Sequence, residues 1–206
     1  MPAGTPTGIS ITARQYVPES PHKTPAPAEH PQGNLQQALA AQQAVCRQHP
    51  DNADAWFVLA GINARLGRIK DVEHCCRQIL ALQAENTAAR YNLGVALQQQ
   101  GKAEPAIACY RELLEKQPDH APAHANLGLL YHENKQPAEA EAHARRSVLL
   151  DPDKVAAHNT LGLVCLDQER YPEALACFRK AIRLDPGYVQ GHYNTGLALL
   201  RSDQPE

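Results

Sequence analysis

The sequence predicts an all-α fold, a solenoid of stacked antiparallel helix pairs with a repeat of 34 residues. The first observation is a Leu-Gly dipeptide that begins at Leu93, Leu127 and Leu161, at constant spacing (127 − 93 = 34; 161 − 127 = 34). The second is that small residues and prolines recur in the same register: Ala106, Ala140 and Ala174, with Pro118, Pro152 and Pro186. Such self-similarity is typical of arrays in which each unit buries its apolar face against its neighbours.

The units within each repeat are predicted to be helices. Each repeat contains two apolar-periodic stretches of about three turns, a helical rather than a strand pattern. In the third repeat these stretches cover about 121–134 and 137–150. Pro137 and Pro172 stand where second helices begin, a position at which a missing N–H costs nothing. Asp-Pro at 151–152 ends a helix, because the residue before proline is disfavoured in the α conformation.

These positions resemble the tetratricopeptide repeat family. The family pattern is a bulky residue, Leu-Gly, a tyrosine, and then a small residue, an aromatic, another small residue and a proline. In the repeat at 155–188 these slots hold His158, Leu161, Gly162, Cys165, Ala174, Phe178, Ala181 and Pro186. The departures are His or Arg where Trp is usual, and a weak first repeat. The resemblance covers about 34–206 and implies a right-handed superhelix whose first helices line a concave groove.

The expected organisation follows the register from one end to the other. Residues 1–33 form a Pro-rich segment that we expect to be disordered, because it cannot bury enough apolar surface. A lone capping helix, about 34–49, then fills the segment 34–52. The remaining segments are four repeats at 53–86, 87–120, 121–154 and 155–188, and the first helix (about 189–201) of a truncated repeat at 189–206. That last helix lacks a partner, so we expect the array to continue in a longer protein.

Composition restricts the class of protein. A hydrophobic fraction of 43% and a formal net charge of −2 are typical of a soluble globular chain. The near-neutral balance argues against nucleic acid as a partner, since that would need a basic face. The sequence has neither an 18-residue apolar run for a membrane span nor an apolar secretory signal. We also find no phosphate loop, nucleophile elbow or metalloprotease motif, and therefore predict no catalytic residues, no cofactor and no enzyme within this chain.

The cysteines invite a metal or disulfide hypothesis. Cys75, Cys109 and Cys177 share one repeat position, which His143 fills in the intervening repeat. Equivalent positions in successive repeats lie roughly 8–10 Å apart. Disulfides need Cα atoms within about 7 Å, and zinc ligands must converge on one ion. We therefore predict six free thiols and no metal, which indicates a reducing, cytoplasmic compartment.

A histidine ladder occupies the bulky slot of the first helices. His124, His158 and His192 follow one another at the repeat spacing, which excludes a shared metal. We expect these rings to pack between helices with a ring nitrogen on a polar group. His120 and His124 are spaced like a ligand pair, but Pro122 lies between them at a helix start, so we do not assign them to a metal.

The concave groove is the predicted binding site. Asn92, Asn126 and Asn194 share one slot of the first helices, with Thr160 in the fourth rung and Asn159 beside it. Carboxamides donate and accept hydrogen bonds, so a row of them can hold the amides of an extended peptide. We expect Tyr91, Tyr193, Leu129 and Leu163 to add apolar contact area, and the groove face to be solvated. The row resembles the asparagine ladder of O-linked N-acetylglucosamine transferases; asparagine that is merely common at this slot in the family would leave the same pattern.

Three functions follow from these expectations. The first is an interaction module that binds a protein or peptide segment in the groove. The second is the substrate-recruiting part of a larger transferase, of the glycosyltransferase or sulfotransferase type, with its catalytic domain beyond residue 206. The third is self-association through exposed end helices. A carboxylate-tail adaptor for heat-shock chaperones is disfavoured, because groove slots that would need cations hold Phe57, Gly61, Ala125 and Asn126.

Overall fold

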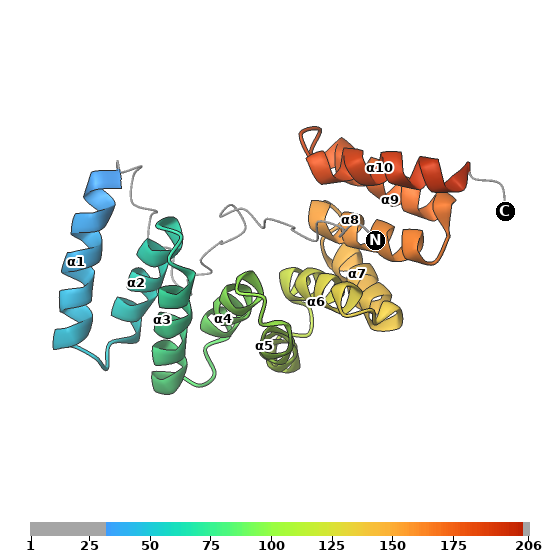
Figure 1. Cartoon of the computed structure of the whole chain (residues 1–206). Helices are drawn as coiled ribbons and strands as arrows, with labels where there is room; N and C mark the ends of the chain where they lie inside the picture. The colour runs from blue at the N-terminus through green and yellow to red at the C-terminus, as the bar shows by residue number, and fades with distance from the viewer. Residues whose placement is uncertain (1–31, 204–206) are drawn as a thin grey trace, which may run out of the picture. The chain divides into compact units, whose positions relative to one another are not determined.

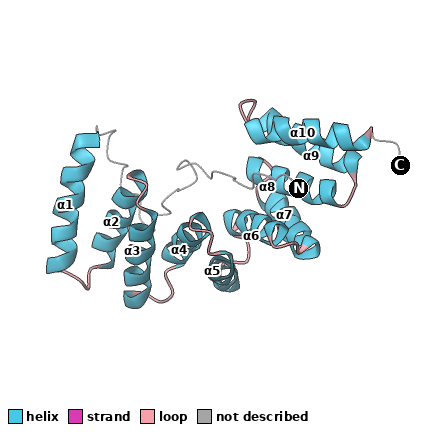
Figure 2. Cartoon of the chain, in the orientation of Figure 1, coloured by secondary structure: helices cyan, strands magenta, loops and turns pink. Residues whose placement is uncertain are grey.

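The computed structural model describes residues 32–203, and every regular element in that range is a helix (Figures 1 and 2). The helices are α1 (Gln32–Gln48), α2 (Ala53–Arg65), α3 (Ile69–Leu82), α4 (Thr87–Gln99), α5 (Ala103–Lys116), α6 (Ala121–Glu133), α7 (Pro137–Leu150), α8 (Val155–Asp167), α9 (Tyr171–Leu184) and α10 (Val189–Ser202). The predicted all-α fold is confirmed. Of the Pro-rich segment predicted to be disordered, residues 1–31 lie outside the described residues, and α1 begins at Gln32, slightly earlier than expected.

The described helices belong to two compact units, divided within α5 between Cys109 and Tyr110. In unit 1, α2 packs against α1 and α3, and α3 packs against α4. In unit 2, α6 packs against α7 and α8, and α9 packs against α8 and α10. Within each unit these helices therefore pack mainly against their neighbours in the chain, the arrangement typical of a stacked repeat array.

A ladder of N–H donors explains why histidine and arginine replace tryptophan at the bulky slot. Each of these side chains donates to the backbone carbonyl six residues earlier, at the end of the preceding repeat. The bonds are Trp56 to Pro50 (2.9 Å), Arg90 to Ala84 (2.6 Å), His124 to Pro118 (2.9 Å), His158 to Pro152 (2.8 Å) and His192 to Pro186 (3.0 Å). A carbonyl only accepts, so the three histidines carry their proton on Nε2. The expectation that a ring nitrogen reaches a polar group is confirmed.

The first helices also share an N-cap slot. Asn52 and Asn86 accept hydrogen bonds from the amides of Ala55 (3.0 Å) and Ala89 (2.9 Å). His120 does the same through Nδ1, which accepts from the amide of Ala123 at 3.0 Å. A side chain that satisfies an orphan amide in this way stabilises the helix by about 1 kcal/mol. His120 is thus a helix cap, and its spacing from His124 reflects two separate backbone contacts.

Small residues set how closely the helices of one repeat approach each other. A Cβ added to Gly128 would lie 3.1 Å from the backbone nitrogen of Ala144, so α6 and α7 touch there through backbone. A Cβ added to Gly162 would lie 2.4 Å from the ring of Phe178, which is fully buried between α8 and α9. The two repeats thus fill the space beside the glycine differently, with the backbone at Ala144 in one and the ring of Phe178 in the other.

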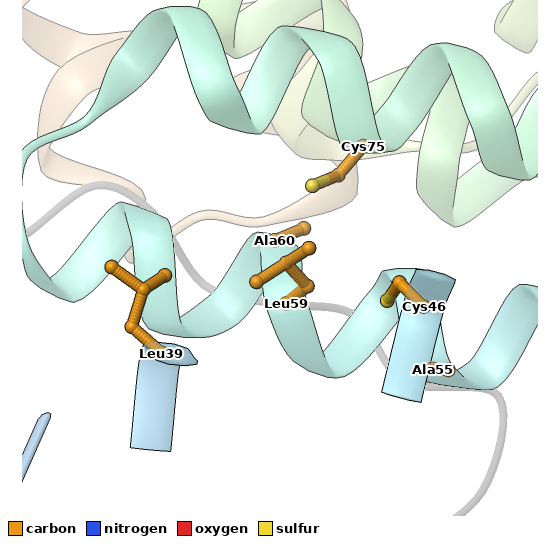
Figure 3. Close-up of a cluster of buried hydrophobic side chains, with 6 residues drawn as sticks. All are labelled: Leu39, Cys46, Ala55, Leu59, Ala60 and Cys75. Carbon is orange, nitrogen blue, oxygen red and sulfur yellow. The ribbon is translucent and has the colours of Figure 1, made fainter. Parts of the chain in front are cut away.

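The core of unit 1 includes a cluster contributed by three helices. Figure 3 shows Leu39 and Cys46 of α1, Ala55, Leu59 and Ala60 of α2, and Cys75 of α3. Trp56 packs against the same cluster while its indole N–H makes the ladder bond. Burying each large aliphatic side chain here contributes about 1.5–3 kcal/mol.

A charged clip joins consecutive repeats inside unit 1. The Glu73 carboxylate in α3 accepts from Lys102 (2.8 Å) and Gln100 (2.6 Å) of the next repeat, and pairs with Arg77 at 2.7 Å. The hydrogen bond from Lys102 is the main reason why the pKa of Glu73 is lowered. The carboxylate is largely covered, with a side chain 12% exposed, so this clip is better protected from solvent than an ordinary surface ion pair.

The same clip recurs in unit 2, 68 residues later (141 − 73 = 68). Glu141 pairs with Arg170 (2.7 Å) and Arg145 (2.7 Å), and accepts a longer bond from Gln168 (3.4 Å). Burial alone would raise the pKa of Glu141, but the hydrogen bond from Arg170 and the charge of Arg145 outweigh it and lower the pKa. One repeat after Glu73, Gln100 and Lys102, the equivalent positions hold uncharged residues. These are Ile107, Asn134 and Gln136.

Candidate functional site

The predicted groove residues lie in both units. Tyr91 and Asn92 are on α4 of unit 1, and the other six are on α6, α8 and α10 of unit 2. Unit 2 brings α8 into contact with both α6 and α10, so Asn126, Leu129, Asn159, Leu163, Tyr193 and Asn194 lie on packed neighbours. We describe the two parts of the row separately.

In unit 2 the row contains a direct link between two carboxamides. The Nδ2 group of Asn194 donates to the Oδ1 atom of Asn159 at 2.9 Å, and both side chains are buried. Thr160, which shares the repeat slot of Asn194, instead donates from its hydroxyl to the carbonyl of Ala156 in its own helix. In this rung the contact to the next first helix is therefore made by Asn159, one residue before the slot.

The third asparagine of unit 2 is fixed by a tyrosine. Asn126 is half-buried, and its Nδ2 group donates to the hydroxyl of Tyr110 at 3.0 Å. Leu129 and Leu163 are half-buried, whereas Tyr193 is 69% exposed on α10. The exposed phenol ring of Tyr193 is thus the predicted apolar contact most open to a partner.

In unit 1 the buried carboxamide has an unused acceptor. Asn92 is 1% exposed, and its Oδ1 atom has no hydrogen-bond partner among the described residues. Asn194 contacts the residue 35 positions before it; the same offset from Asn92 leads to Phe57, which has no polar atom (194 − 159 = 35; 92 − 57 = 35). A buried acceptor without a donor costs about 1–3 kcal/mol, and a ligand N–H would remove that cost.

One expectation about this face is wrong. We expected the asparagine row to be solvated in the free protein, but Asn92, Asn159 and Asn194 are buried. Tyr91 is buried too. In unit 2 the first helices pack against each other, α8 with both α6 and α10, and Asn159 and Asn194 meet at one of these contacts. Substitutions in this row must therefore be controlled for stability as well as for binding.

Unit 1 also contains a cavity that the sequence did not indicate. It has a volume of about 240 Å³ and lies between α1, α2 and α3. Trp56, Asn63, His74 and Cys75 are among its lining residues. Asn63 is 2% exposed; its Nδ2 group contacts the Cys75 sulfur at 3.8 Å, and its Oδ1 atom has no partner among the described residues. The sequence feature that could have indicated this cavity is Asn63, a carboxamide at the slot that holds Leu97 one repeat later.

A histidine pair in unit 2 was also missed. The Nδ1 atoms of His124 and His143 lie 2.8 Å apart, and Tyr131 stacks on the His143 ring with centroids 5.5 Å apart. Because Nε2 of His124 donates to Pro118, Nδ1 of the neutral ring accepts, so His143 donates from Nδ1. Burial lowers the pKa of both rings, that of His143 to about 4, with His124 and Arg111 adding to the shift for His143.

The cysteines are all free thiols. The spacing argument applies to Cys75, Cys109 and Cys177, which belong to one slot. It does not apply to Cys165, which lies in the other helix of the same hairpin as Cys177, at the 12-residue offset at which Asn63 contacts Cys75 (177 − 165 = 12; 75 − 63 = 12). Within residues 32–203, no three His, Cys, Asp or Glu side chains are grouped to hold a metal ion. None of the helices in that range is long and apolar enough to cross a membrane.

Comparison with known families places these features in context. A family model described as a tetratricopeptide repeat matches residues 31–71 and 91–155, and a second, described as a TPR repeat, matches residues 162–203. The first model alone covers half of the chain. The chain therefore belongs to the tetratricopeptide repeat family.

Solved structures agree on the fold. MamA (residues 41 to the end) from Desulfovibrio magneticus RS-1 is 21% identical, with a TM-score of 0.68 over 77% of this chain and 89% of that one. YrrB, a TPR protein with an unusual peptide-binding site, is 19% identical, with a TM-score of 0.64 over 81% and 86%. The first TPR of Spaghetti (RPAP3), bound to the HSP90 peptide SRMEEVD, is 19% identical, with a TM-score of 0.55 over 58% and 95%. No curated protein matches the chain by sequence.

Proposed function

We propose that this chain is a protein-interaction module that binds an extended segment of a partner along its first helices. Membership of the tetratricopeptide repeat family supports a module of this class. Two of the structural neighbours, YrrB and the first TPR of RPAP3, have a peptide-binding site or a bound peptide. The family matches concern the repeats alone and give the transferase alternative no support.

The observation that carries the proposal is the hydrogen-bonding state of the carboxamides. The Oδ1 atom of Asn92 has no partner within residues 32–203, and an extended peptide presents an N–H donor at every residue except proline. Asn159 and Asn194 use one acceptor and one donor on each other, which leaves one N–H of Asn194 and one lone pair of Asn159 for a ligand. Such contacts read the backbone of a partner rather than its side chains.

Specificity comes from the apolar positions in this proposal. Tyr193, exposed on α10, and the half-buried Leu129 and Leu163 select a segment with apolar side chains. An acidic tail such as the one bound to RPAP3 fits poorly, because Phe57, Gly61 and Ala125 offer it no positive charge. The partner is therefore an extended, mainly uncharged protein segment.

Binding can be tested with peptides selected from a displayed library of random linear sequences. We expect Asn92→Ala combined with Asn126→Ala to weaken the selected peptide about tenfold or more, as expected for lost hydrogen bonds of 1–3 kcal/mol. Arg179→Ala, an exposed change on α9, serves as the control and should leave affinity unchanged. Helical content of each variant is checked by circular dichroism. Unchanged affinity in the double variant, with loss in the control, would contradict the proposal.

Self-association through α10 is a second candidate, favoured by the apolar surface of that helix. Val189, Tyr193 and Leu200 are more than 60% exposed, and Leu199 is 42% exposed. Sedimentation velocity over a range of concentrations would detect a dimer. Leu200→Glu should abolish it, whereas a concentration-independent monomer would exclude self-association.

A further inference from the structure

The two helices of each repeat face each other at a constant offset of 12 residues. In the first repeat Asn63 faces Cys75, with Nδ2 and sulfur 3.8 Å apart. In the third repeat Tyr131 faces His143, with ring centroids 5.5 Å apart. The same register places Cys165 of α8 opposite Cys177 of α9 (177 − 165 = 12). This is the hairpin in which both facing residues are cysteines.

The guanidinium group of Arg170 contacts one of these two sulfurs. The Nη2 group of Arg170 donates to the sulfur of Cys165 at 2.9 Å. Arg170 is held there by Glu141 of the preceding repeat, at 2.7 Å. The hydrogen bond from Cys177 and the contact with Arg170 lower the pKa of Cys165 to about 7. The hydrogen bond to Cys165 and burial raise the pKa of Cys177, so the two thiols are chemically different.

We propose that Cys165 and Cys177 form a site of reversible oxidation, a dithiol that hydrogen peroxide converts into a disulfide within the α8–α9 hairpin. The site is built by its surroundings: an arginine fixed by a carboxylate polarises one sulfur, and the second thiol faces it from the other helix of the hairpin to resolve the product. Because the hairpin already places the two cysteines opposite each other, bond formation requires rotation of side chains rather than a new pairing of helices.

The chemistry balances with peroxide as the oxidant. The Cys165 thiolate attacks one peroxide oxygen, the O–O bond breaks, and hydroxide leaves and takes up a proton to become water. The sulfur of Cys177 then attacks the sulfenic sulfur of Cys165, so that an S–S bond forms and the S–O bond breaks. The departing hydroxide takes the proton of Cys177. In total two thiols lose two electrons and two protons, and one peroxide becomes two waters.

The other cysteines provide controls within the same chain. Cys109 occupies the slot of Cys177 two repeats earlier (177 − 109 = 68), but the facing position holds Leu97. Burial raises the pKa of Cys75 to about 12, and burial also raises the pKa of Cys46 and Cys76. Thiols at such pKa values are poor nucleophiles near neutral pH. The site is therefore specific to one hairpin.

The test uses the full chain, treated with hydrogen peroxide, quenched with N-ethylmaleimide and analysed by peptide mass spectrometry. We expect a crosslink between the peptides of Cys165 and Cys177, two hydrogens lighter than the separate peptides, that disappears with dithiothreitol. Cys75 and Cys109 should be recovered alkylated. The proposal would be overturned if no crosslink forms and Cys165 and Cys177 are recovered alkylated to the same extent as Cys109.

Arg170→Gln tests the role of the cation as a positioning residue. If Arg170 supports the thiolate, this change should slow crosslinking about tenfold at pH 7 and much less at pH 9, where the thiolate forms without help. The matched control is Lys102→Gln, which changes the same slot of the other clip and should leave the rate unchanged. Circular dichroism verifies the fold of both. Equal rates for Arg170→Gln and the parent at both pH values would contradict this role.

Discussion

Asn194 donates a hydrogen bond to Asn159 at 2.9 Å, although the two asparagines stand at different positions of their repeats. Both are buried, so neither carboxamide can exchange its partner freely for water. The pair couples two consecutive first helices through polar groups on the face where we place the binding site. In the proposed binding mode, each carboxamide is oriented by the other before a ligand arrives, which would reduce the entropy lost on binding.

The coupling between these residues can be measured with a double-mutant cycle. Asn159→Ala and Asn194→Ala should each cost about 1–3 kcal/mol of unfolding free energy, because each leaves a buried partner unsatisfied. The double variant should cost less than the sum by about 1 kcal/mol. Urea denaturation gives the three values. Strict additivity would mean that the hydrogen bond does not contribute to stability.

The donor ladder predicts which residues its slot tolerates. His158→Phe should lower the unfolding free energy by about 1–2 kcal/mol, since the Pro152 carbonyl loses its donor. His158→Trp restores an N–H at the position where Trp56 makes the same bond, and should recover most of this loss. The same denaturation assay compares the two. If phenylalanine and tryptophan behave alike, ring size rather than the N–H explains the slot.

Two glycines at the same slot should respond in opposite directions. Gly162→Ala should destabilise by about 1–3 kcal/mol, because its Cβ meets the buried ring of Phe178 at 2.4 Å. A Cβ added to Gly196 on α10 has no atom within 4 Å. Gly196→Ala should therefore raise the unfolding free energy by about 0.5–1 kcal/mol through helix propensity. Thermal and urea midpoints give the signs. A stabilising Gly162→Ala would contradict the close helix approach.

Acid should weaken unit 2 through the His124–His143 pair. The pKa of His143 falls to about 4 on folding, below the value of about 6.5 in the unfolded chain. A lowered pKa means that the neutral form is favoured by folding, so this stability is complete above pH 6.5 and is lost as pH falls from 6.5 to about 4. Solvent still reaches the half-buried ring, so we expect a loss of about 1–2 kcal/mol.

The control for this prediction is His143→Cys, which places the residue of the neighbouring repeats in the slot. The groups that face the pair are unchanged in this variant; they include Arg111, Asp119, His120, Glu139 and Arg146. Urea midpoints between pH 4 and pH 7 should depend less on pH in the variant than in the parent. Parallel pH profiles would exclude the pair as the source of the acid sensitivity.

The cavity of unit 1 makes a prediction about Asn63. Its carboxamide is buried, makes only a long contact to sulfur, and has an oxygen without a partner among the described residues. Asn63→Leu, the residue found at the next repeat, should therefore stabilise unit 1 by about 1 kcal/mol. The thermal midpoint of the full chain provides the measurement. Destabilisation of similar size would mean that the carboxamide is satisfied in solution, for example by bound water.

Much of the fold was predictable because packing repeats with the register. The Leu-Gly and proline positions indicate the helix pairs, and the donor role of His124, His158 and His192 follows from the family slot they fill. Gly128 and Gly162 were predictable as close contacts for the same reason. These features depend on backbone geometry that each repeat reproduces. The same residue pattern therefore occurs several times in one sequence.

The candidate site was less predictable because it depends on particular pairs of side chains. Asn159 lies one residue from the shared slot, and only the helix packing shows that it contacts Asn194. Cys165 does not share the slot of the other cysteines, so a comparison between repeats could not reveal Cys177 as its partner. The burial of Asn92 likewise depends on neighbours that the slot pattern does not specify.

The central claim, that the asparagine row binds an extended peptide, is tested most directly by NMR of the side-chain amides. Asparagine-selective ¹⁵N labelling gives one pair of NH₂ signals per residue, which are followed while a library-selected peptide is added. We predict that the signals of Asn92, Asn126, Asn159 and Asn194 shift, whereas those of the helix caps Asn52 and Asn86 remain unchanged. Shifts confined to the caps, with the four row signals unmoved at saturation, would contradict the account.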